Sequence, residues 1–217
     1  MVIPRLYSYF RSSASFRVRI ALGLKGIDYE IVPVHLLREG GEQLRPEFRR
    51  LNPNATVPVL EQGGAALSQS LAIIEYLDEI HPEPPLLPGS AADRARIRAL
   101  SLTIACDIHP LNNLRVLRYL NKVLGVEEEA RNKWYRHWVE EGLAGVEAML
   151  VGRPATGRFC HGDAPTLADC CLVPQIFNAQ RVDCRLDHLP TIMAIHERCM
   201  TLAAFQRAAP AAQPDTE

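Results

Sequence analysis

The sequence lacks any apolar run of about 18 residues, the length that crosses a bilayer, and its charges nearly cancel. Its 217 residues include 24 Lys and Arg against 25 Asp and Glu, a formal net charge of −1. So small a charge creates no long-range field to attract phosphate backbones or anionic lipids, so we expect neither nucleic acid nor membrane as a partner. The opening MVIPR also lacks the basic segment and apolar core of an export signal, and we expect a cytosolic protein.

The sequence also lacks the spacing of cysteines and histidines that is typical of metal sites. The first hundred residues contain no cysteine, and the sequence has no C-x-x-C pair. Its seven histidines are scattered. We therefore expect no metal site and interpret the cysteines as buried thiols. The six cysteines are Cys106, Cys160, Cys170, Cys171, Cys184 and Cys199.

The first eighty residues alternate between strand-like and helix-like patterns. Residues 2–9 read as a strand, and residues 14–25 place Phe16, Ile20 and Leu24 on one helical face. The sequence thus predicts a βαβ-ββα unit. Its remaining elements are a strand over 28–34, a helical stretch over 42–53, a hairpin over 57–68 that turns at Gly63-Gly64, and a helix over 70–82.

A proline-rich stretch separates this unit from a purely helical region. Residues 82–90 (PEPPLLPGS) contain four prolines and read as a semi-rigid linker. We therefore expect a domain over 1–82, a linker over 83–90 and an all-helical domain over 91–217. Helical patterns cover about 91–124, 127–150, 166–182 and 189–206, and the final ten residues form a Pro/Ala tail with little to pack.

Three short motifs carry local physical signals. Val57-Pro58 stands at the head of a strand, where proline must occupy an edge or a turn. This pattern alone is compatible with either a cis or a trans peptide bond. Gln69-Ser70 precedes an apolar helix, where Ser70 either caps the helix or helps attract a carboxylate. Thr166 and Asp169 have capping-box spacing, a structural role.

The stretch SYFRSSASFRVRIAL over 8–22 crowds serines and arginines at the start of a helix. Ser12, Ser13 and Ser15 could each donate a hydrogen bond to an anion there, or simply cap the helix. Arg17 and Arg19 lie two residues apart and cannot share one helix face, so we expect these helical arginines to be solvated or paired.

These motifs resemble the zeta class of glutathione transferases, the maleylacetoacetate isomerase family. The resemblance spans nearly the whole chain, although Ala14 stands where the family usually has cysteine and Phe16 where it has tryptophan. It implies an α/β thioredoxin-like N-terminal domain, an all-α C-terminal domain and a homodimer. The matching segments are SSASFRVRIALGLKGIDYE, LNPNATVPVL, LSQSLAIIEYL, DIHPLNNLRVL and TLADCCLVPQ.

The resemblance also implies roles for particular residues. Ser12 is the principal catalytic hydroxyl, which holds the thiolate of glutathione, the cofactor. Arg11, Arg115 and Arg181 are implied to clamp a dicarboxylate substrate, with surface ion pairs as the alternative. His35 could instead be a surface histidine, and His109 with Asn113 a buried polar cap. The implied glutathione contacts are Ser13, His35, Gln43, the main chain of Val57 before a cis bond, Gln69, Ser70, His109 and Asn113.

The implied activity is glutathione-dependent cis–trans isomerisation of maleylacetoacetate in the breakdown of aromatic compounds. Because the reacting sulfur belongs to glutathione, Ala14 does not remove this chemistry. One alternative is isomerisation of maleylpyruvate in the gentisate route. Others are general zeta-class transferase or α-haloacid dehalogenase activity and, from another class, a non-catalytic glutathione-binding module.

Overall fold

The computed structural model describes residues 3–217, and the chain forms two compact units. One comprises the chain up to Leu86 together with Met200–Glu217, and the other comprises Leu87–Cys199. The first boundary lies inside the predicted linker. Residues 200–217, which the sequence patterns placed in the helical domain, instead group with the first unit.

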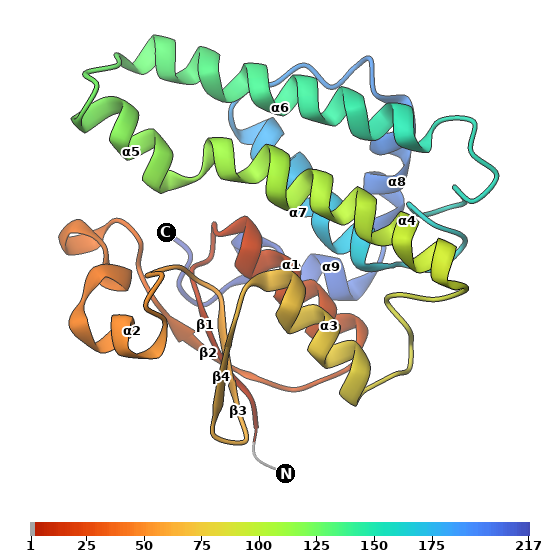
Figure 1. Ribbon diagram of the computed structural model, residues 1–217, viewed down its shortest axis with the longest axis horizontal. Helices are drawn as coiled ribbons and strands as arrows, with labels where there is room; N and C mark the ends of the chain where they lie inside the picture. Colours follow the sequence, from red (N-terminus) through yellow and green to blue (C-terminus); the bar gives the residue numbers. More distant parts are fainter. Residues whose placement is uncertain (1–2) are drawn as a thin grey trace. The chain divides into compact units, whose positions relative to one another are not determined.

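The first unit is built on a four-stranded sheet (Figure 1). Its order is β2-β1-β3-β4, with β1 parallel to β2 and β3 antiparallel to both β1 and β4. This is the predicted βαβ-ββα arrangement. The strand expected over 2–9 is shorter, and Val2 lies outside the described residues. The strands are β1 (Arg5–Ser8), β2 (Glu30–Pro33), β3 (Val59–Gln62) and β4 (Ala65–Ser68).

Helices pack on both faces of this sheet. Figure 1 shows α1 (Ser13–Leu24) and α3 (Ser70–Ile80) on one side of the strands and α2 (Pro46–Leu51) on the other. The stretch expected to be helical over 42–53 divides into a 3₁₀ turn, η2 (Glu42–Leu44), and α2. The core is fully buried, so burial of apolar area is the main stabilising term. Its members include Leu6, Ile20, Leu60, Ile73, Ile74 and Leu77.

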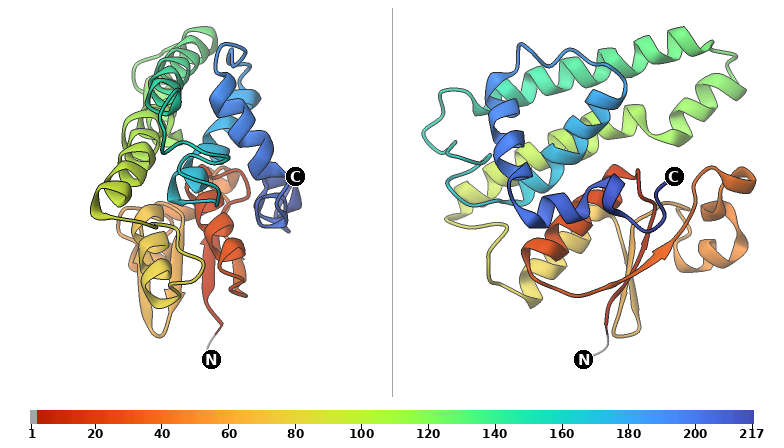
Figure 2. Two further views of the ribbon diagram at one scale, coloured as in Figure 1. Left: turned by 90° about the vertical axis from the view of Figure 1, so that its right-hand side faces the viewer. Right: turned by 180° about the vertical axis from the view of Figure 1, so that it is seen from behind.

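Glycines permit two close features of this unit. Gly63 and Gly64 have φ of 58° and 83°, which suits the tight turn predicted between β3 and β4. A Cβ built on Gly23 would lie only 3.3 Å from Cα of Ala204, so α1 and α9 (Ala203–Ala208) approach closely. Figure 2 shows α9 alongside α1.

The predicted Pro/Ala tail is not loose, and the expectation that it has little to pack is wrong. Pro210 and Gln213 are buried within the first unit. The Gln213 amide donates to the carbonyl oxygens of Arg207 and Ala209 at 2.8 and 2.9 Å. These hydrogen bonds fold the segment back on itself, which its composition does not reveal.

The second unit is helical, as predicted, but two expected helices are broken. The pattern over 91–124 divides because Asn113 adopts an extended backbone, with φ −64° and ψ 145°, and caps a new helix. The pattern over 189–206 divides because Leu202 is extended, with φ −92° and ψ 131°. The segments are α4 (Ala91–Leu102), the π-helical η3 (Thr103–Ile108), the 3₁₀ turn η4 (His109–Asn112), α5 (Leu114–Lys122), α6 (Glu128–Leu150), α7 (Leu167–Arg181) and α8 (Pro190–Met200).

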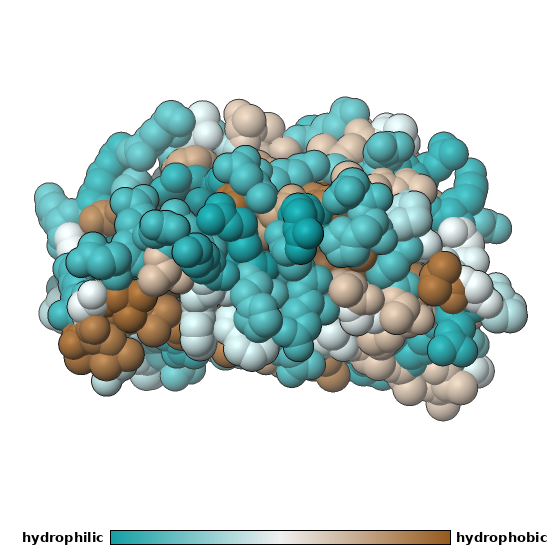
Figure 3. Space-filling model, turned by 90° about the horizontal axis from the view of Figure 1, so that it is seen from above, coloured by the Kyte–Doolittle hydropathy of each residue, from teal (hydrophilic) through white to brown (hydrophobic). Residues whose placement is uncertain are grey.

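The helices carry substantial charge on their exposed faces. The face of the molecule in Figure 3 is mainly hydrophilic, with hydrophobic side chains gathered near one end. Among residues 3–217, no helix has the length and apolar character needed to cross a membrane.

A buried capping box fixes the start of α7, as its spacing predicts. Asp169 has an exposed fraction of 0 %. Its carboxylate accepts hydrogen bonds from the main-chain N–H and hydroxyl of Thr166, at 2.8 and 2.9 Å, and from the N–H of Cys160 at 2.9 Å. Burial raises the pKa of Asp169, and these hydrogen bonds oppose that rise.

We expect Asp169→Ala to lower the free energy of unfolding by about 3 kcal/mol, because each buried N–H left without an acceptor costs about 1–3 kcal/mol. Urea denaturation followed by tryptophan fluorescence measures this, since Trp134 and Trp138 both lie in α6 of the same unit. Asp187→Ala is the matched control, because its side chain is 91 % exposed and should change stability by less than about 0.5 kcal/mol. Equal effects of the two substitutions would contradict the structural role of Asp169.

Candidate active site

Three connections meet at one edge of the sheet. Tyr7 of β1 pairs with Val59 of β3, which in turn pairs with Ser68 of β4. The residues just after β1, just before β3 and just after β4 therefore lie at the same edge. These connections carry Ser12, Val57 and Gln69. The strand register thus brings together side chains that are far apart in the sequence.

Ser12 is the N-cap of α1. Its hydroxyl oxygen accepts a hydrogen bond from the N–H of Ser15 at 3.2 Å, and its own N–H donates to the carbonyl of Tyr9 at 2.9 Å. A hydroxyl that accepts in this way keeps its hydrogen to donate to another group. Ser12 is partly exposed, whereas Ser13 is 4 % exposed and Ser15 is fully buried. Of the three serines, Ser12 is the most accessible to a ligand.

The start of α3 forms the second part of the site. Gln69 has φ 71° and ψ 115°, a left-handed conformation that is unusual for a residue with a side chain and tends to occur at ligand sites. Ser70 is the first residue of α3 and is 6 % exposed. The Val57-Pro58 bond before β3 is cis, as the resemblance implied, and Val57 is 7 % exposed.

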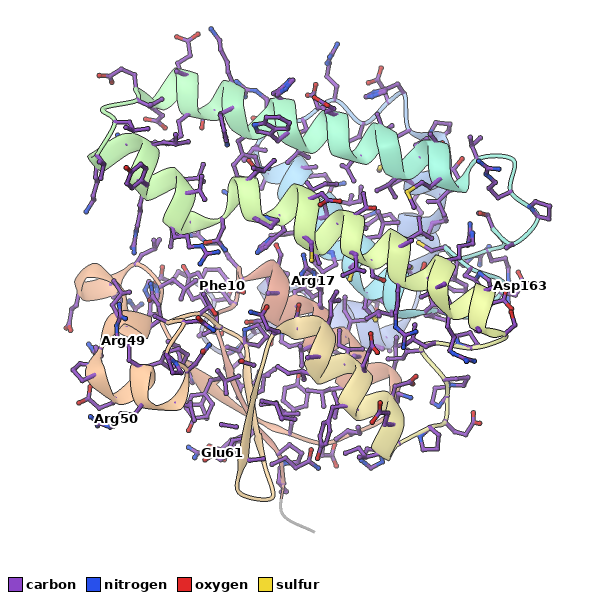
Figure 4. All side chains as sticks on the ribbon, in the orientation of Figure 1. Phe10, Arg17, Arg49, Arg50, Glu61 and Asp163 are labelled. Atoms are coloured by element: carbon purple, nitrogen blue, oxygen red, sulfur yellow. The ribbon has the colours of Figure 1, made fainter. Side chains whose placement is uncertain are left out.

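Two buried arginines support this edge, and sequence reasoning missed their burial. Arg17 and Arg19 are 2 % and 1 % exposed, so they are not solvated. The Arg17 guanidinium donates to the Ser70 hydroxyl at 3.2 Å, which links α1 to the start of α3 (Figure 4). A signal was available, because apolar residues occupy all sides of this helix, as expected for a helix buried all round.

His35 belongs to the loop after β2 and is 8 % exposed, so the surface alternative is wrong. Its Nδ1 accepts hydrogen bonds from the N–H groups of Leu37 and Arg38 at 3.2 and 2.8 Å. The remaining proton therefore belongs on Nε2, which lies 3.3 Å from Oε1 of Glu217. The imidazole thus stabilises the loop, and a contact with glutathione stays a prediction.

A cavity of about 350 Å³ opens beside this loop. Gln43, another predicted glutathione contact, lies in η2 of the same loop and is 7 % exposed. The residues that line the cavity are Pro33, His35, Arg38, Glu42, Pro214, Asp215 and Thr216.

Arg11 lies in the turn after β1 and is exposed. Its guanidinium carbon lies 5.3 and 5.9 Å from the ring centroids of Phe10 and Tyr9, and one nitrogen donates to the Tyr9 hydroxyl at 3.2 Å. Aromatic rings hold the guanidinium by cation–π attraction while its exposed edge remains available. Arg11 can therefore present a charge next to Ser12.

The helical unit contains the other predicted contacts. The Asn113 amide nitrogen lies 3.5 Å from Nε2 of His109, so these two residues meet as their spacing predicts. Asn113 also caps α5 by accepting from the N–H of Arg115 at 3.1 Å, but Asn113 and His109 are both half-buried, so the cap is not a buried one. Arg115 and Arg181 are exposed, and the Arg181 guanidinium lies 5.9 Å from the Tyr135 ring centroid. Their roles toward a substrate stay predictions.

All six cysteines lie in the helical unit. Cys160, Cys170, Cys171 and Cys199 are buried as expected, but Cys106 is exposed and Cys184 is half-buried. Burial raises the pKa of the Cys160 thiol well above its usual value. Among residues 3–217, no group of three or more His, Cys, Asp and Glu side chains could hold a metal ion.

Comparisons with known proteins agree on one family. The family model "Glutathione S-transferase, N-terminal domain" matches residues 6–85. A probable maleylacetoacetate isomerase of Vibrio cholerae is 53 % identical over 210 residues, which cover 97 % of each chain.

Solved structures give the same result. The holo structure of a maleylpyruvate isomerase, a bacterial zeta-class glutathione S-transferase, is 49 % identical with a TM-score of 0.95, covering 98 % of this chain and 100 % of that one. A maleylacetoacetate isomerase from Anaeromyxobacter dehalogenans 2CP-1 has dicarboxyethyl glutathione and citrate bound in its active site. It is 44 % identical with a TM-score of 0.86, covering 99 % of this chain and 98 % of that one.

Proposed function

Because the chain belongs to the zeta-class glutathione transferase and maleylacetoacetate isomerase family, we propose that it catalyses the glutathione-dependent cis–trans isomerisation of maleylacetoacetate. The observation that carries the proposal is the partly exposed N-cap hydroxyl of Ser12, located at the sheet edge that Val57 and Gln69 also reach. The product belongs to the breakdown of aromatic compounds.

The residues at the sheet edge fit glutathione. The Ser70 hydroxyl accepts from Arg17, so its own hydrogen can be donated to a carboxylate, and the main-chain N–H groups at the start of α3 also favour negative charge. We assign the γ-glutamyl end to Gln69 and Ser70, and the cysteinyl main chain to Val57. Ser13, His35 and Gln43 supply further contacts, with His109 and Asn113 from the helical unit.

When bound, glutathione supplies a thiolate that adds to one carbon of the cis double bond, which leaves a single bond free to rotate; the sulfur then leaves as the trans double bond forms. Ser12 donates a hydrogen bond to the sulfur, and the start of α1 favours its negative charge. This matters because only a few per cent of a free thiol is ionised near neutral pH. Ala14 provides no competing thiol at this helix terminus.

Arginines orient the substrate in this proposal. A dicarboxylate is best held by planar guanidinium groups, which form two parallel hydrogen bonds to one carboxylate. Arg11 is placed beside Ser12 by the rings of Tyr9 and Phe10. Arg115 and Arg181 are the candidates from the helical unit, and both are exposed. Charge that develops on the substrate during addition is stabilised by the same cations.

Maleylpyruvate is the second candidate substrate, because the 49 % identical structure is a maleylpyruvate isomerase. The chemistry is the same on a shorter dicarboxylate. General transfer or dehalogenation of α-halo acids uses the same thiol, and a non-catalytic glutathione-binding module would need only Val57, Gln69 and Ser70. Retention of an accessible Ser12 favours a catalyst.

We further propose a homodimer in the cytosol. The family resemblance supports the dimer. All six cysteines have free thiols, which fits a reducing compartment.

The function is tested by assaying dialysed protein on maleylacetoacetate and on maleylpyruvate, with and without glutathione. We expect turnover only with glutathione, faster on maleylacetoacetate, and unchanged by EDTA. Faster turnover of maleylpyruvate would favour the second candidate. Retention on immobilised glutathione without turnover of either compound would favour a binding module, and loss of activity in EDTA would contradict the mechanism.

We expect Ser12→Ala to lower kcat by about 10²-fold, the usual effect of removing one donor to a developing anion. Glutathione affinity should change little, because the hydroxyl acts mainly on the sulfur. Steady-state kinetics and calorimetric titration measure the two quantities. Ser15→Ala is the matched control, since Ser15 is fully buried. Near-normal kcat in Ser12→Ala would assign the role to Ser13 or to main-chain N–H groups.

Arg11→Leu and Arg181→Leu should each raise the KM for the dicarboxylate and leave glutathione binding almost intact. One lost charge-assisted contact costs about 1.5–3 kcal/mol, roughly 10- to 150-fold in affinity. Lysine at either position should restore only part of the lost substrate affinity, because an ammonium cannot form the planar pair of hydrogen bonds. Arg50→Leu in α2 is the control, since that side chain is 72 % exposed (Figure 4). An unchanged KM on both substrates would identify the altered arginine as an ordinary surface residue.

A further inference from the structure

The turn that carries Arg11 and Ser12 is held by residues some two hundred positions later in the sequence. The N–H of Phe10 donates to Oδ2 of Asp215 at 2.9 Å. The carbonyl of the same residue accepts from Nη2 of Arg19 at 3.0 Å. Phe10 is only 6 % exposed, so both of its polar main-chain groups depend on these partners.

Arg19 ties the turn to α9. Its Nε donates to the carbonyl of Ala208 at 2.9 Å, and its Nη1 donates to the hydroxyl of Ser8 at 3.1 Å. Burial lowers the pKa of Arg19 to about 10, which still leaves it charged near neutral pH. A buried cation that bonds to Ser8, Phe10 and Ala208 sets the spacing between the end of β1 and α9.

Asp215 is itself held in place by its own segment. The Thr216 hydroxyl donates to the carbonyl of Pro210 at 3.1 Å, and Gln213 donates to Arg207 and Ala209. Further along, Glu217 pairs with Arg38, and the hydrogen bond from Arg38 lowers the pKa of Glu217. The Asp215 carboxylate is thus a fixed acceptor and not the end of a freely moving tail.

We propose that Asp215 is a positioning residue for the reaction, which acts through the turn over 9–12 to place Ser12. This inference rests on the proposed function of Ser12. The path is short, because the N–H of Ser12 donates to the carbonyl of Tyr9, in the peptide unit whose N–H belongs to Phe10 and bonds to Asp215. Without its acceptor, the buried Phe10 N–H must turn toward another partner, and the Tyr9 carbonyl moves with it. A displacement of about 1 Å at a catalytic group can cost up to 10²-fold in rate.

The experiment compares Asp215→Ala with Asp215→Asn, which keeps an oxygen acceptor. For Asp215→Ala we expect kcat to fall about tenfold, and the pH profile of kcat to shift upward because the glutathione thiol ionises less readily. Asp215→Asn should keep kcat and its pH profile close to those of the parental protein. Asp187→Ala is the matched control, since that aspartate is 91 % exposed and belongs to none of these hydrogen bonds. Thermal melting and glutathione titration establish that each variant is folded.

A double mutant separates positioning from general destabilisation. In a Ser12→Ala background, Asp215→Ala should lower kcat at saturating substrate no further, because residues that act through one group are not additive. A full additional tenfold loss would overturn the inference, as would a parental kcat and pH profile in Asp215→Ala while Ser12→Ala is impaired. Parental kcat in Ser12→Ala would instead contradict the proposed function.

A further variant keeps the test valid if Asp215→Ala does not fold. Asp215→Glu keeps the charge but moves the carboxylate outward by one methylene. We expect its melting temperature to match that of the parental protein. Its kcat should be lower, and the pH profile of kcat should shift to higher pH. Parental values for both in Asp215→Glu would overturn the inference.

Discussion

The guanidinium of Arg19 is buried at 1 % exposure, and its donors are used by Ser8, Phe10 and Ala208. Burial of a cation costs free energy unless the cation is hydrogen-bonded, so the fold must place these acceptors within reach of Arg19. Ser8 is the last residue of β1, Phe10 lies in the turn that follows, and Ala208 is the last residue of α9. The position of one side chain therefore determines both where the turn before α1 lies and why α9 packs against α1. The geometry of Ser12 depends on that arrangement.

In the first unit, two helices begin with a serine hydroxyl that accepts a hydrogen bond from the protein. At α1 a hydroxyl that accepts a hydrogen bond from the main chain is left with a hydrogen to donate, and at α3 the Ser70 hydroxyl accepts from the buried Arg17 instead. Both hydroxyls are thereby oriented as donors toward an anion, with the helix dipole in the same sense. The difference is in strength, since a charged donor behind Ser70 polarises it more than a main-chain N–H polarises Ser12. In the proposed reaction this difference suits a permanent carboxylate at α3 and a sulfur at α1 that must gain and lose its charge.

Local patterns predicted the parts of this protein whose partners are close in sequence. The hairpin at Gly63-Gly64 and the capping box at Asp169 follow from adjacent residues, and both are observed. The break at Asn113 was missed because the apolar period continues through it. Arg19 was misjudged because two of its acceptors are the main-chain carbonyls of Phe10 and Ala208, which no side-chain pattern records. The family resemblance supplied the identity of the site residues, and it alone links Arg181 to a substrate.

The first unit is assembled from two pieces of chain that enclose the whole helical unit in sequence. Synthesis runs from the N-terminus, so the sheet emerges from the ribosome before Ala208 and Asp215 exist. Until then Arg19 lacks its α9 acceptor, and the N–H of Phe10 lacks its carboxylate. The turn around Ser12 reaches its final form only after residues 208–215 have been made. A chain that stopped before residue 208 would thus contain Ser12, the proposed catalytic serine, without two of the hydrogen bonds that hold its turn.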